Sequence, residues 1–496
     1  MPDFWRILLP LLFLVPLLSA QETHSHGAPE KLGKVSFPIS CVPDVQGRFD
    51  RGVALLHSFA YNAAEEAFQD VAELDPRCAM AHWGVAMTYF HQLWDPPIEL
   101  ATISSAQKEV HRAQQIGAGS ERERQFIHAL SLLYQDTATV PYRTRVLNYE
   151  QAMSHLAAEN RKDVEAQVFY ALALLASANP TDKTHAKQKK AADLLEPIDR
   201  AYPQHPGAPH YLIHAYDNAE LAPKGLAAAR AYSQIAPSAP HALHMPSHIF
   251  TRLGLWDDSI NSNLAAREAA HRQGDTGEEL HAMDYLVYAY LQSGRDNDAA
   301  RVIQQLKNMP TPDVGEFKIA YASTAMPIRY EVERSQWANA AGIVPRPAAP
   351  PNVAAIGVWA RGLGLARSGH AAEASAEIDR LRQLEEQLRT SGDDYWATQV
   401  GILRREVMAW SAQANGKTDE AAALMRRSAD EEDAIEKLPV TPGPIVPARE
   451  QLGFLLLEQK HPGPALKEFE TALVNAPGRR GALQGAAQAA ELSHKN

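Results

Sequence analysis

Two stretches of this chain decide the fold because they share a spacing: HPGAPHYLIHAYD at residues 205–217 and HALHMPSHIFTRLGLW at residues 241–256. His210 of the first stretch recurs as His244 of the second, 34 residues later. His214, four positions after His210, recurs in the same way as His248. A step of 34 residues is the length of one helix–turn–helix unit in a stacked array. The spacing therefore predicts a stack of helical hairpins.

The same stretches are rich in histidine. The residues from His205 to His248 hold six histidines, whereas the whole chain holds 20 in 496 residues. Two histidines at i and i+4 lie on one side of a helix. The pairs His210–His214 and His244–His248 therefore predict matching imidazole faces on neighbouring units, and they are the main indication of function.

Composition agrees with close-packed helices. Aromatic residues make up only 7% of the chain, and alanine recurs in short runs, where small side chains let helix backbones approach. The formal net charge of −11 argues against nucleic-acid binding driven by phosphate contacts. We therefore expect no nucleic-acid partner.

The first 20 residues are typical of a signal peptide. An apolar stretch from Ile7 to Leu18 precedes a small residue, Ala20, at the expected cleavage point. The alternative is an uncleaved anchor, but prolines interrupt the stretch and it is too short to span a bilayer comfortably. We expect export to the periplasm or the extracellular space, with no membrane span after cleavage.

The chain has two cysteines, Cys41 and Cys78. In an exported protein a disulfide between them is a reasonable hypothesis, and it would close a loop over the first helical hairpin. The alternative is a pair of buried or unpaired thiols.

The clearest repeat unit lies near the C-terminus. Gly453 and Ala465 are small enough to let two helices cross closely, and Leu452, Leu456 and Phe469 would fill the space beside them. Similar units recur along the chain and predict eight or nine hairpins between residues 45 and 477. Proline-containing irregular connections are expected at 178–183, 309–315, 343–352 and 438–447.

These units predict the domain organisation. The fold class is all-α, with helix–turn–helix repeats stacked into a right-handed superhelical solenoid. The predicted segments are a signal peptide (1–20), an N-terminal extension (21–44), an N-terminal array with a histidine-rich groove (45–309), an irregular connection (310–352), a C-terminal array (353–477), and a capping helix and tail (478–496).

The chain resembles the tetratricopeptide repeat superfamily, and more narrowly a family of exported bacterial tetratricopeptide proteins without a well-assigned activity. The segments that carry the resemblance are LLHSFAYNAAEEAF (55–68), DPRCAMAHWGVAM (75–87), DYLVYAYLQ (284–292), VTPGPIVPARE (440–450) and the two histidine stretches above. The resemblance implies a concave groove, lined by the first helix of each hairpin, that holds a protein or peptide. It does not imply catalysis.

Further histidines and aspartates lie on the same predicted helix faces as the histidine pairs. Further candidates follow at spacings of three and four, so several imidazoles and two carboxylates could converge on one patch of the groove. The candidate metal ligands are His210, His214, Asp217, His241, His244, His248, His281 and Asp284, and the candidate groove residues are Tyr288 and Thr251. Imidazole and carboxylate are the ligands expected for zinc or another divalent transition metal.

Two alternatives stay open. The histidines could be packed and hydrogen-bonded without metal, and Pro246 could start a new helix, shift the register of the second pair and leave His241 on a loop. Four other histidines lack matching partners and predict core or surface roles: His57, His82, His91 and His128. His24 and His26 form a short His-x-His near the expected mature N-terminus, an end that we expect to be disordered. The proline-rich stretch 440–450 is expected to be a plain connector.

The sequence therefore favours an exported solenoid that binds a protein or peptide in its groove and carries a histidine and aspartate metal site. The alternative is a metal-dependent hydrolase built on the same residues, with three protein ligands and a water. The glutamate of the metalloprotease helix motif is absent between the paired histidines.

Overall fold

The computed structural model describes residues 30–91, 93, 100–310, 315–346 and 349–494. Within these ranges the chain is all-α, and successive helices pack against one another along the chain. The all-α class is therefore confirmed. The expected signal peptide (1–20), His24 and His26 lie outside the described residues.

The helices are numbered in chain order. The N-terminal ones are η1 (Pro43–Val45), α1 (Gln46–His57), α2 (Tyr61–Leu74), α3 (Ala79–Thr88), α4 (Leu100–Ile116), α5 (Glu121–Tyr134), α6 (Tyr142–Glu159), α7 (Val164–Ala176), α8 (Ala186–Ala201), α9 (Gly207–Tyr216), η2 (Ala222–Gly225), α10 (Leu226–Ile235), α11 (Pro240–His244), α12 (Pro246–Arg252) and α13 (Trp256–Gln273). The remaining ones are α14 (Thr276–Gln292), α15 (Asp296–Asn308), α16 (Phe317–Val332), α17 (Trp337–Ala341), α18 (Pro351–Arg367), α19 (Ala374–Thr390), α20 (Asp394–Ala414), α21 (Thr418–Asp433), α22 (Ala448–Glu458), α23 (Pro462–Asn475) and α24 (Arg480–His494).

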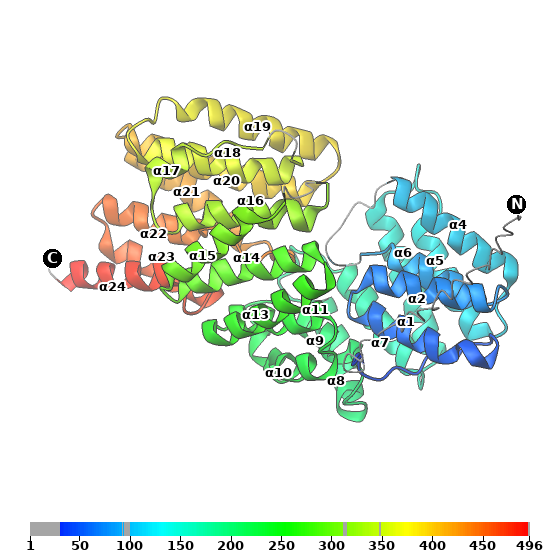
Figure 1. Cartoon of the computed structure of the whole chain (residues 1–496). Coiled ribbons are helices and arrows are strands. Elements are labelled where there is room, and N and C mark those ends of the chain that lie inside the picture. Colours follow the sequence, from blue (N-terminus) through cyan, green and yellow to red (C-terminus); the bar gives the residue numbers. More distant parts are fainter. Residues whose placement is uncertain (1–29, 92, 94–99, 311–314, 347–348, 495–496) are drawn as a thin grey trace, which may run out of the picture.

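Most of these helices pair as consecutive hairpins, which Figure 1 shows stacked from the N-terminal to the C-terminal end. The described residues form eleven pairs, more than the eight or nine expected: α1–α2, α3–α4, α5–α6, α7–α8, α9–α10, α11/α12–α13, α14–α15, α16–α17, α18–α19, α20–α21 and α22–α23. The count is higher because some units are short, such as the one that ends in the five-residue α17.

The expected irregular connection at 310–352 was partly wrong. Between its proline-rich ends the chain forms α16 and α17. Helix α16 buries apolar side chains such as Ile319, Met326 and Val332, and this buried face stabilises the helix although Pro327 lies inside it. The prolines that suggested an irregular segment mostly flank these helices.

Small residues bring the paired helices close together. A side chain added at Gly453 in α22 would place its Cβ 2.6 Å from the ring of Phe469 in α23, and Ala465 is fully buried beside them. Leu452 and Leu456 are buried at the same crossing. The predicted packing of this unit is therefore confirmed.

The buried apolar side chains form three clusters. One runs from Leu32 to Phe250, a second from Ile260 to Met326, and a third from Ala320 to Ala489. The first cluster belongs mainly to α1–α12, which lie at the right and centre of Figure 1, and the third belongs to α16–α24, which lie at the left. Helices α13–α15 lie between them.

The C-terminal end of the array folds back onto its middle. Helix α24 contacts α14, and Trp256 Nε1 at the start of α13 donates a hydrogen bond to the Gly478 carbonyl (3.2 Å). The fully buried Arg479 forms ion pairs with Glu333 (2.9 Å) and Glu450 (2.7 Å). The described array is therefore closed on itself between α13 and α24.

A second contact between distant parts comes from residues 436–447, which join α21 to α22 and are called the crossing segment below. The Glu436 N–H donates to the Pro180 carbonyl (2.7 Å), between α7 and α8. Val440 is buried in the N-terminal apolar cluster, although its neighbours in sequence belong to the C-terminal part. The crossing segment is therefore not a plain connector, because it contacts the chain between α7 and α8 and packs into the N-terminal apolar cluster.

The first described residues also pack onto the array. Phe37 is fully buried among Phe49, Trp83 and Phe126. A disulfide joins Cys41 to Cys78, with the Cα atoms 5.0 Å apart. The extension is thus tied to the start of α3.

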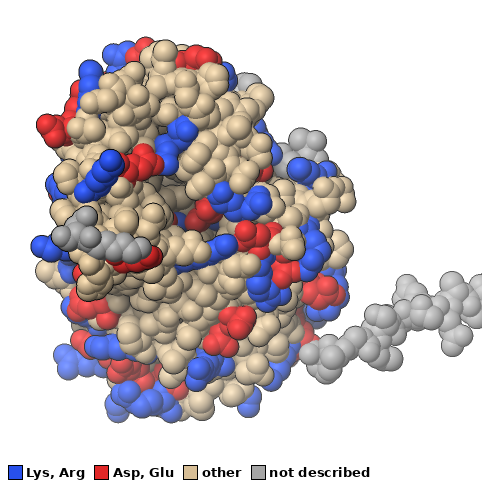
Figure 2. All heavy atoms as spheres, turned by 90° about the vertical axis from the view of Figure 1, so that its left-hand side faces the viewer, with Lys and Arg blue, Asp and Glu red and all other residues tan. Residues whose placement is uncertain are grey.

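The surface has mixed charge on the face that Figure 2 shows. Lys and Arg side chains alternate there with Asp and Glu, without an extended patch of one sign. Together with the net charge of −11, this face offers no basic surface of the kind that binds phosphate backbones. Among the described helices, none combines the length and the apolar character needed to cross a bilayer.

Candidate metal centre

Among the residues that the structure describes, three buried groups of side chains have ligand atoms within 4.8 Å of one another. We call His210, His214 and His241 triad A, and His244, His248 and His281 triad B. The third is the Glu165 group, which consists of His57, Glu165 and His205. All of these side chains are buried, so the groups must satisfy their ring nitrogens inside the protein.

The two predicted histidine pairs do not close on one ion. Each pair is completed by a third histidine, His241 for the first pair and His281 for the second. Helix α11 ends at His244 and α12 begins at Pro246, joined by Met245 in a helical backbone conformation. His241 lies on α11 and is not on a loop, and it joins the first pair instead of the second.

In triad B, His244 and His248 each carry their ring hydrogen on Nδ1, which points away from the other histidine. His244 Nδ1 lies 2.6 Å from Asn263 Oδ1, and Asn263 Nδ2 donates to the Ser259 carbonyl, so the amide oxygen is the acceptor. His244 must therefore carry its hydrogen on Nδ1. His248 Nδ1 lies 2.9 Å from Asp217 Oδ2, an acceptor only, so His248 also carries its hydrogen on Nδ1.

The inner nitrogens of the same pair then face each other without a proton. His244 Nε2 and His248 Nε2 are 3.0 Å apart. A neutral imidazole has one N–H and one lone pair, so both Nε2 atoms present lone pairs. Two lone pairs at this distance repel unless a cation or a hydrogen-bond donor lies beside them, and the Tyr285 hydroxyl lies 3.4 Å from His248 Nε2. Two nitrogens bound to one tetrahedral ion at ~2.05 Å would be about 3.3 Å apart, close to the observed spacing.

Burial keeps these rings neutral. It lowers the pKa of His248 to about 4, against the opposing effect of Asp217. Burial and the neighbouring His281 and His248 hold the pKa of His244 well below its usual value. Burial likewise holds the pKa of His281 well below its usual value. At neutral pH triad B is therefore an uncharged set of three imidazoles.

Asp217 does not raise the pKa of His248 enough to protonate the ring at neutral pH, because two cations share its carboxylate. Its carboxylate accepts from Arg252 Nε (2.8 Å) and Lys437 Nζ (2.9 Å) as well as from His248. Burial alone would raise the pKa of Asp217, but Lys437 and Arg252 hold it well below its usual value. Asp217 thus orients the ring of His248 as a second-layer residue in the manner common around metal ligands.

Triad A repeats this arrangement in part. His210 Nδ1 donates to the His57 carbonyl (2.6 Å), and His241 Nδ1 lies 3.3 Å from Glu278 Oε2. Glu278 also accepts from Lys318 Nζ (2.8 Å), as Asp217 does from its lysine.

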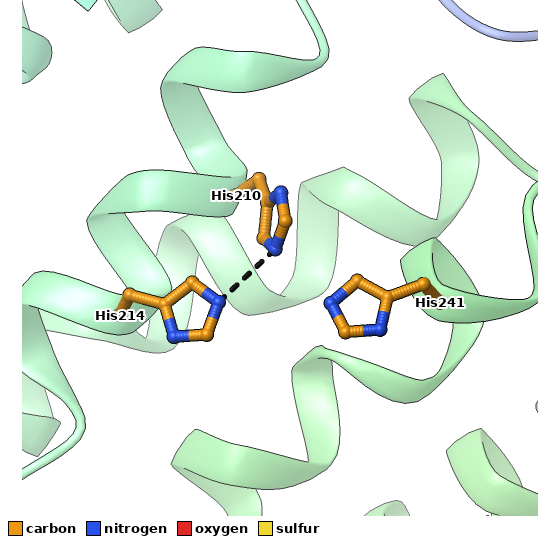
Figure 3. A group of neighbouring side chains, drawn as sticks. All are labelled: His210, His214 and His241. Atoms are coloured by element: carbon orange, nitrogen blue, oxygen red, sulfur yellow. Dashed lines mark hydrogen bonds between the residues drawn. The ribbon is translucent and has the colours of Figure 1, made fainter. Parts of the chain in front are cut away.

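The inner pair of triad A differs from that of triad B. His214 Nε2 lies 3.1 Å from His210 Nε2, and Figure 3 shows His241 with a ring nitrogen turned toward these two. The Nδ1 atom of His214 has no hydrogen-bond acceptor, so its ring can carry the hydrogen on Nε2 and donate it to His210. The pair in triad A can therefore satisfy itself.

In the Glu165 group every ring nitrogen has a matching partner. His57 Nε2 (2.8 Å) and His205 Nε2 (3.0 Å) both donate to the Glu165 carboxylate. His57 Nδ1 accepts from Tyr211, and His205 Nδ1 accepts from the Gly207 and Ala208 N–H groups at the start of α9. Burial alone would raise the pKa of Glu165, but the two imidazoles bring it below its usual range. This group needs no ion.

The two predicted aspartate ligands lie outside both triads. Asp217 contacts His248 from behind, as described above. Asp284 is buried 3.8 Å from the guanidinium of Arg329, and its oxygens accept no hydrogen bond. Burial raises the pKa of Asp284 to about 6, against the opposing effect of Arg329.

The predicted groove residues are also buried. Tyr288 lies against Arg479 (3.4 Å) near the C-terminal closure, and Thr251 Oγ1 lies 3.2 Å from Ser259 Oγ. Neither side chain belongs to a triad.

The crossing segment covers triad B. The Tyr285 hydroxyl lies 3.4 Å from His248 Nε2, and it can donate to the carbonyls of Pro439 (3.3 Å) or Thr441 (3.2 Å) in that segment. Thr441 also lines a cavity of about 170 Å³, together with both predicted groove residues, Thr251 and Tyr288. The crossing segment therefore forms part of the wall of the expected groove, which keeps a cavity at this place.

Sequence reasoning missed the residues that support the rings. Glu165, Asn263 and Glu278 hold ring nitrogens, and Lys437 lies far along the chain from the histidines. Glu278 precedes His281 by three positions, which was a usable signal. The others had none, because they follow no repeat spacing.

Comparisons with known proteins give no family. No family model matches the chain, and no curated protein matches it. Solved structures show only distant likeness. The yeast Tom70 structure has a TM-score of 0.34 and 12% identity and covers 90% of this chain and 88% of its own. The P58(IPK) TPR domain has a TM-score of 0.24 and 12% identity and covers 91% of this chain and 99% of its own. An IFIT1 mutant with a capped RNA has a TM-score of 0.37 and 10% identity and covers 84% of this chain and 90% of its own. We draw the fold from the helices themselves.

Proposed function

We propose that this chain is a helical-repeat metalloprotein that binds a transition-metal ion at triad B. One observation supports the proposal most directly: His244 Nε2 and His248 Nε2 lie 3.0 Å apart, and the partners of both rings direct lone pairs toward each other. A bound cation converts this repulsion into two coordinate bonds. The third ligand is His281, which completes a set of three imidazoles.

The ligand set favours zinc or copper. Imidazole nitrogen suits zinc, copper, nickel and iron, and the affinity of such sites rises toward copper along the first transition series. Three protein ligands leave a fourth position, as in metal sites that bind water or a substrate. Asp217, Lys437 and Arg252 then form a second layer that orients His248.

A metal-dependent hydrolase is the second candidate. The Tyr285 hydroxyl lies 3.4 Å from His248 Nε2 and 3.2 Å from the carbonyl of Thr441, a residue that lines the cavity of about 170 Å³. A zinc-bound water at the fourth position could be activated there for hydrolysis. This candidate requires metal-dependent turnover, which a screen of ester, amide and phosphate substrates with and without chelator would measure.

Binding of a protein or peptide in the concave groove keeps less support at this face. Lys437, Pro439 and Thr441 of the crossing segment already occupy the partners that a peptide would need there. A protein ligand would have to use another surface of the array, or displace this segment.

Export is part of the same proposal. The disulfide between Cys41 and Cys78 supports it, because disulfides persist mainly in oxidising compartments. Mass spectrometry of the protein recovered from the periplasm or medium would find the mature N-terminus near residue 21. An intact Met1 on a membrane-bound protein would contradict export.

The decisive experiment is elemental analysis of the mature protein, purified without a histidine tag, beside the His244→Ala/His248→Ala variant. The wild type should retain metal after dialysis, and the variant should lose the ion at triad B. His271→Ala is the control, because His271 is exposed and outside the triads. A wild type that takes up neither zinc nor copper would contradict the proposal.

A further inference from the structure

Triad A lies directly beside triad B and has the same composition. We propose that triad A holds a second ion, so that the six histidines bind a pair of copper ions as a binuclear centre. The inference rests on the proposed metal at triad B and extends it.

Hydrogen-bond partners around triad A orient the rings of two of its histidines. His210 Nδ1 donates to a backbone carbonyl (2.6 Å), and His241 Nδ1 faces the Glu278 carboxylate (3.3 Å). Both rings therefore direct an Nε2 lone pair inward. Glu278 is in turn held by Lys318 (2.8 Å), so it supports the ring as Asp217 supports His248.

The third member, His214, can turn from donor to ligand. Its Nε2 lies 3.1 Å from His210 Nε2, again close to the ~3.3 Å expected for two nitrogens on one tetrahedral ion. Its Nδ1 is buried without a hydrogen-bond partner, so no contact fixes the ring in its donor form. An ion in triad A replaces one hydrogen bond with three coordinate bonds.

Rings of the two triads lie next to each other. The ring centroids of His214 and His248 are 5.8 Å apart, and those of His241 and His244 are 6.0 Å apart. Within the triads the ring centroids of His210 and His214 are 4.9 Å apart, and those of His244 and His248 are 5.0 Å apart. Neighbouring rings of different triads are thus almost as close as rings of one triad, and the two ions would be neighbours.

The charge around the triads favours copper in its monovalent form. All six ligands are imidazoles, which bind a metal ion in their neutral form and therefore add no negative charge to the site. The nearby carboxylates are already neutralised, Asp217 by Arg252 and Lys437 and Glu278 by Lys318.

Two divalent ions would bring four positive charges into this buried space, and two Cu(I) ions bring two. The solvation lost on burial rises steeply with ion charge, so the monovalent pair costs less. Soft and borderline ligands such as imidazole also suit copper. The site therefore selects against a pair of zinc ions.

The test is an anaerobic titration of the mature full-length protein with Cu(I) against a chromogenic Cu(I) chelator. The wild type should bind two equivalents of copper. His241→Ala removes a ligand from triad A only, and His281→Ala removes one from triad B only. Each variant should bind one equivalent, and His271→Ala should bind two.

Oxidation of the loaded protein by ferricyanide tests whether the ions are adjacent. Neighbouring Cu(II) ions couple magnetically, so the wild type should show an electron paramagnetic resonance signal far below two spins. Each single-site variant should show a signal of about one spin per chain. Circular dichroism identifies a variant that fails to fold, and the wild-type stoichiometry and spin count then decide alone.

The outcomes separate the two proposals. One equivalent in the wild type, lost in His281→Ala and kept in His241→Ala, would overturn the second ion and leave the metal at triad B standing. No copper and no zinc in the wild type would overturn both. Two equivalents with a full two-spin signal would overturn the binuclear centre, and two zinc ions bound in preference to copper would overturn the charge argument.

Discussion

The Glu165 group and triad B are built from similar residues at similar burial, but their ring protons point in opposite directions. In the Glu165 group both His57 and His205 direct an N–H inward to a shared carboxylate. In triad B both His244 and His248 direct an N–H outward and leave lone pairs facing each other. The first arrangement satisfies its ring nitrogens, whereas the second leaves two facing lone pairs that a cation would satisfy. Burial and residue type alone do not distinguish a structural histidine from a ligand.

The largest difference is expected from removal of one ring in each group. His248→Ala removes a ligand from triad B and should lower the affinity for its ion by at least about 100-fold, since loss of second-layer support alone costs 10- to 100-fold. His205→Ala should leave the affinity unchanged. Metal content after dialysis against a chelator measures both, and equal loss of metal in the two variants would contradict the distinction.

The supporting carboxylates should separate the two triads from each other. Asp217→Asn weakens the hold on the Nδ1–H of His248 and should lower the affinity of triad B about 10- to 100-fold. Glu278→Gln contacts His241 and should leave triad B unchanged. Competition with a chelator of known affinity measures the effect. An unchanged affinity in Asp217→Asn would show that the carboxylate does not support the ligand.

Parts of this arrangement could be predicted from the sequence, and parts could not. The spacing of four between His210 and His214 and the 34-residue step predicted helical pairs on neighbouring units, because a helix repeats every 3.6 residues. The spacing could not show that His241 and His281 would complete the pairs as two separate triads, because that depends on how neighbouring helices pack and not on spacing within one helix.

The covering of the site was also beyond sequence reasoning. Lys437 reaches Asp217 across 220 residues, and Val440 packs into a core whose other members precede residue 251. Such contacts depend on the closure of the whole array, for which no local pattern exists. The proline content of this segment suggested only that it would not be helical, which is correct.

Stability should respond in the Glu165 group more than in triad B. His205→Ala removes one of two imidazole donors to a buried carboxylate and two acceptor contacts at the start of α9. Hydrogen bonds to charged groups contribute ~1.5–3 kcal/mol, so we expect a loss of about 2 kcal/mol. His244→Ala in the metal-free protein should cost less electrostatically, because it also relieves the repulsion between lone pairs. Denaturation midpoints without metal measure this, and a costlier His244→Ala would contradict the repulsion argument.

The pH dependence of the metal-free protein should report the neutral rings of triad B. Burial lowers the pKa of His248 to about 4 in the folded state, below its unfolded value of ~6.5. Between these values the unfolded chain takes up a proton that the folded chain does not. Stability therefore falls as the pH falls from ~6.5 to about 4, by ~1.4 kcal/mol per pH unit for this ring.

The matching variant is His248→Gln, which should flatten the slope by about that amount in urea denaturation at pH 6.5, 5.5 and 4.5. His271→Gln should leave it unchanged, because this ring is exposed. Glu165 does not contribute to the slope in the upper part of this window, since its pKa lies below its usual range and it stays ionised there. A slope that His248→Gln leaves intact would mean that His248 is already charged in the folded protein.

The smallest expected effect tests whether the crossing segment belongs to the site. Burial lowers the pKa of Lys437 to about 8, so at neutral pH its ammonium is mostly charged and shares Asp217 with His248. Lys437→Met removes this cation, and Asp217 then acts more strongly on His248. The pKa of His248 should rise by roughly half a unit to one unit, and acid should release the metal at a correspondingly higher pH. Metal retention followed from pH 7 to 4 measures the shift. An unchanged release profile would mean that the crossing segment only covers triad B and does not tune it.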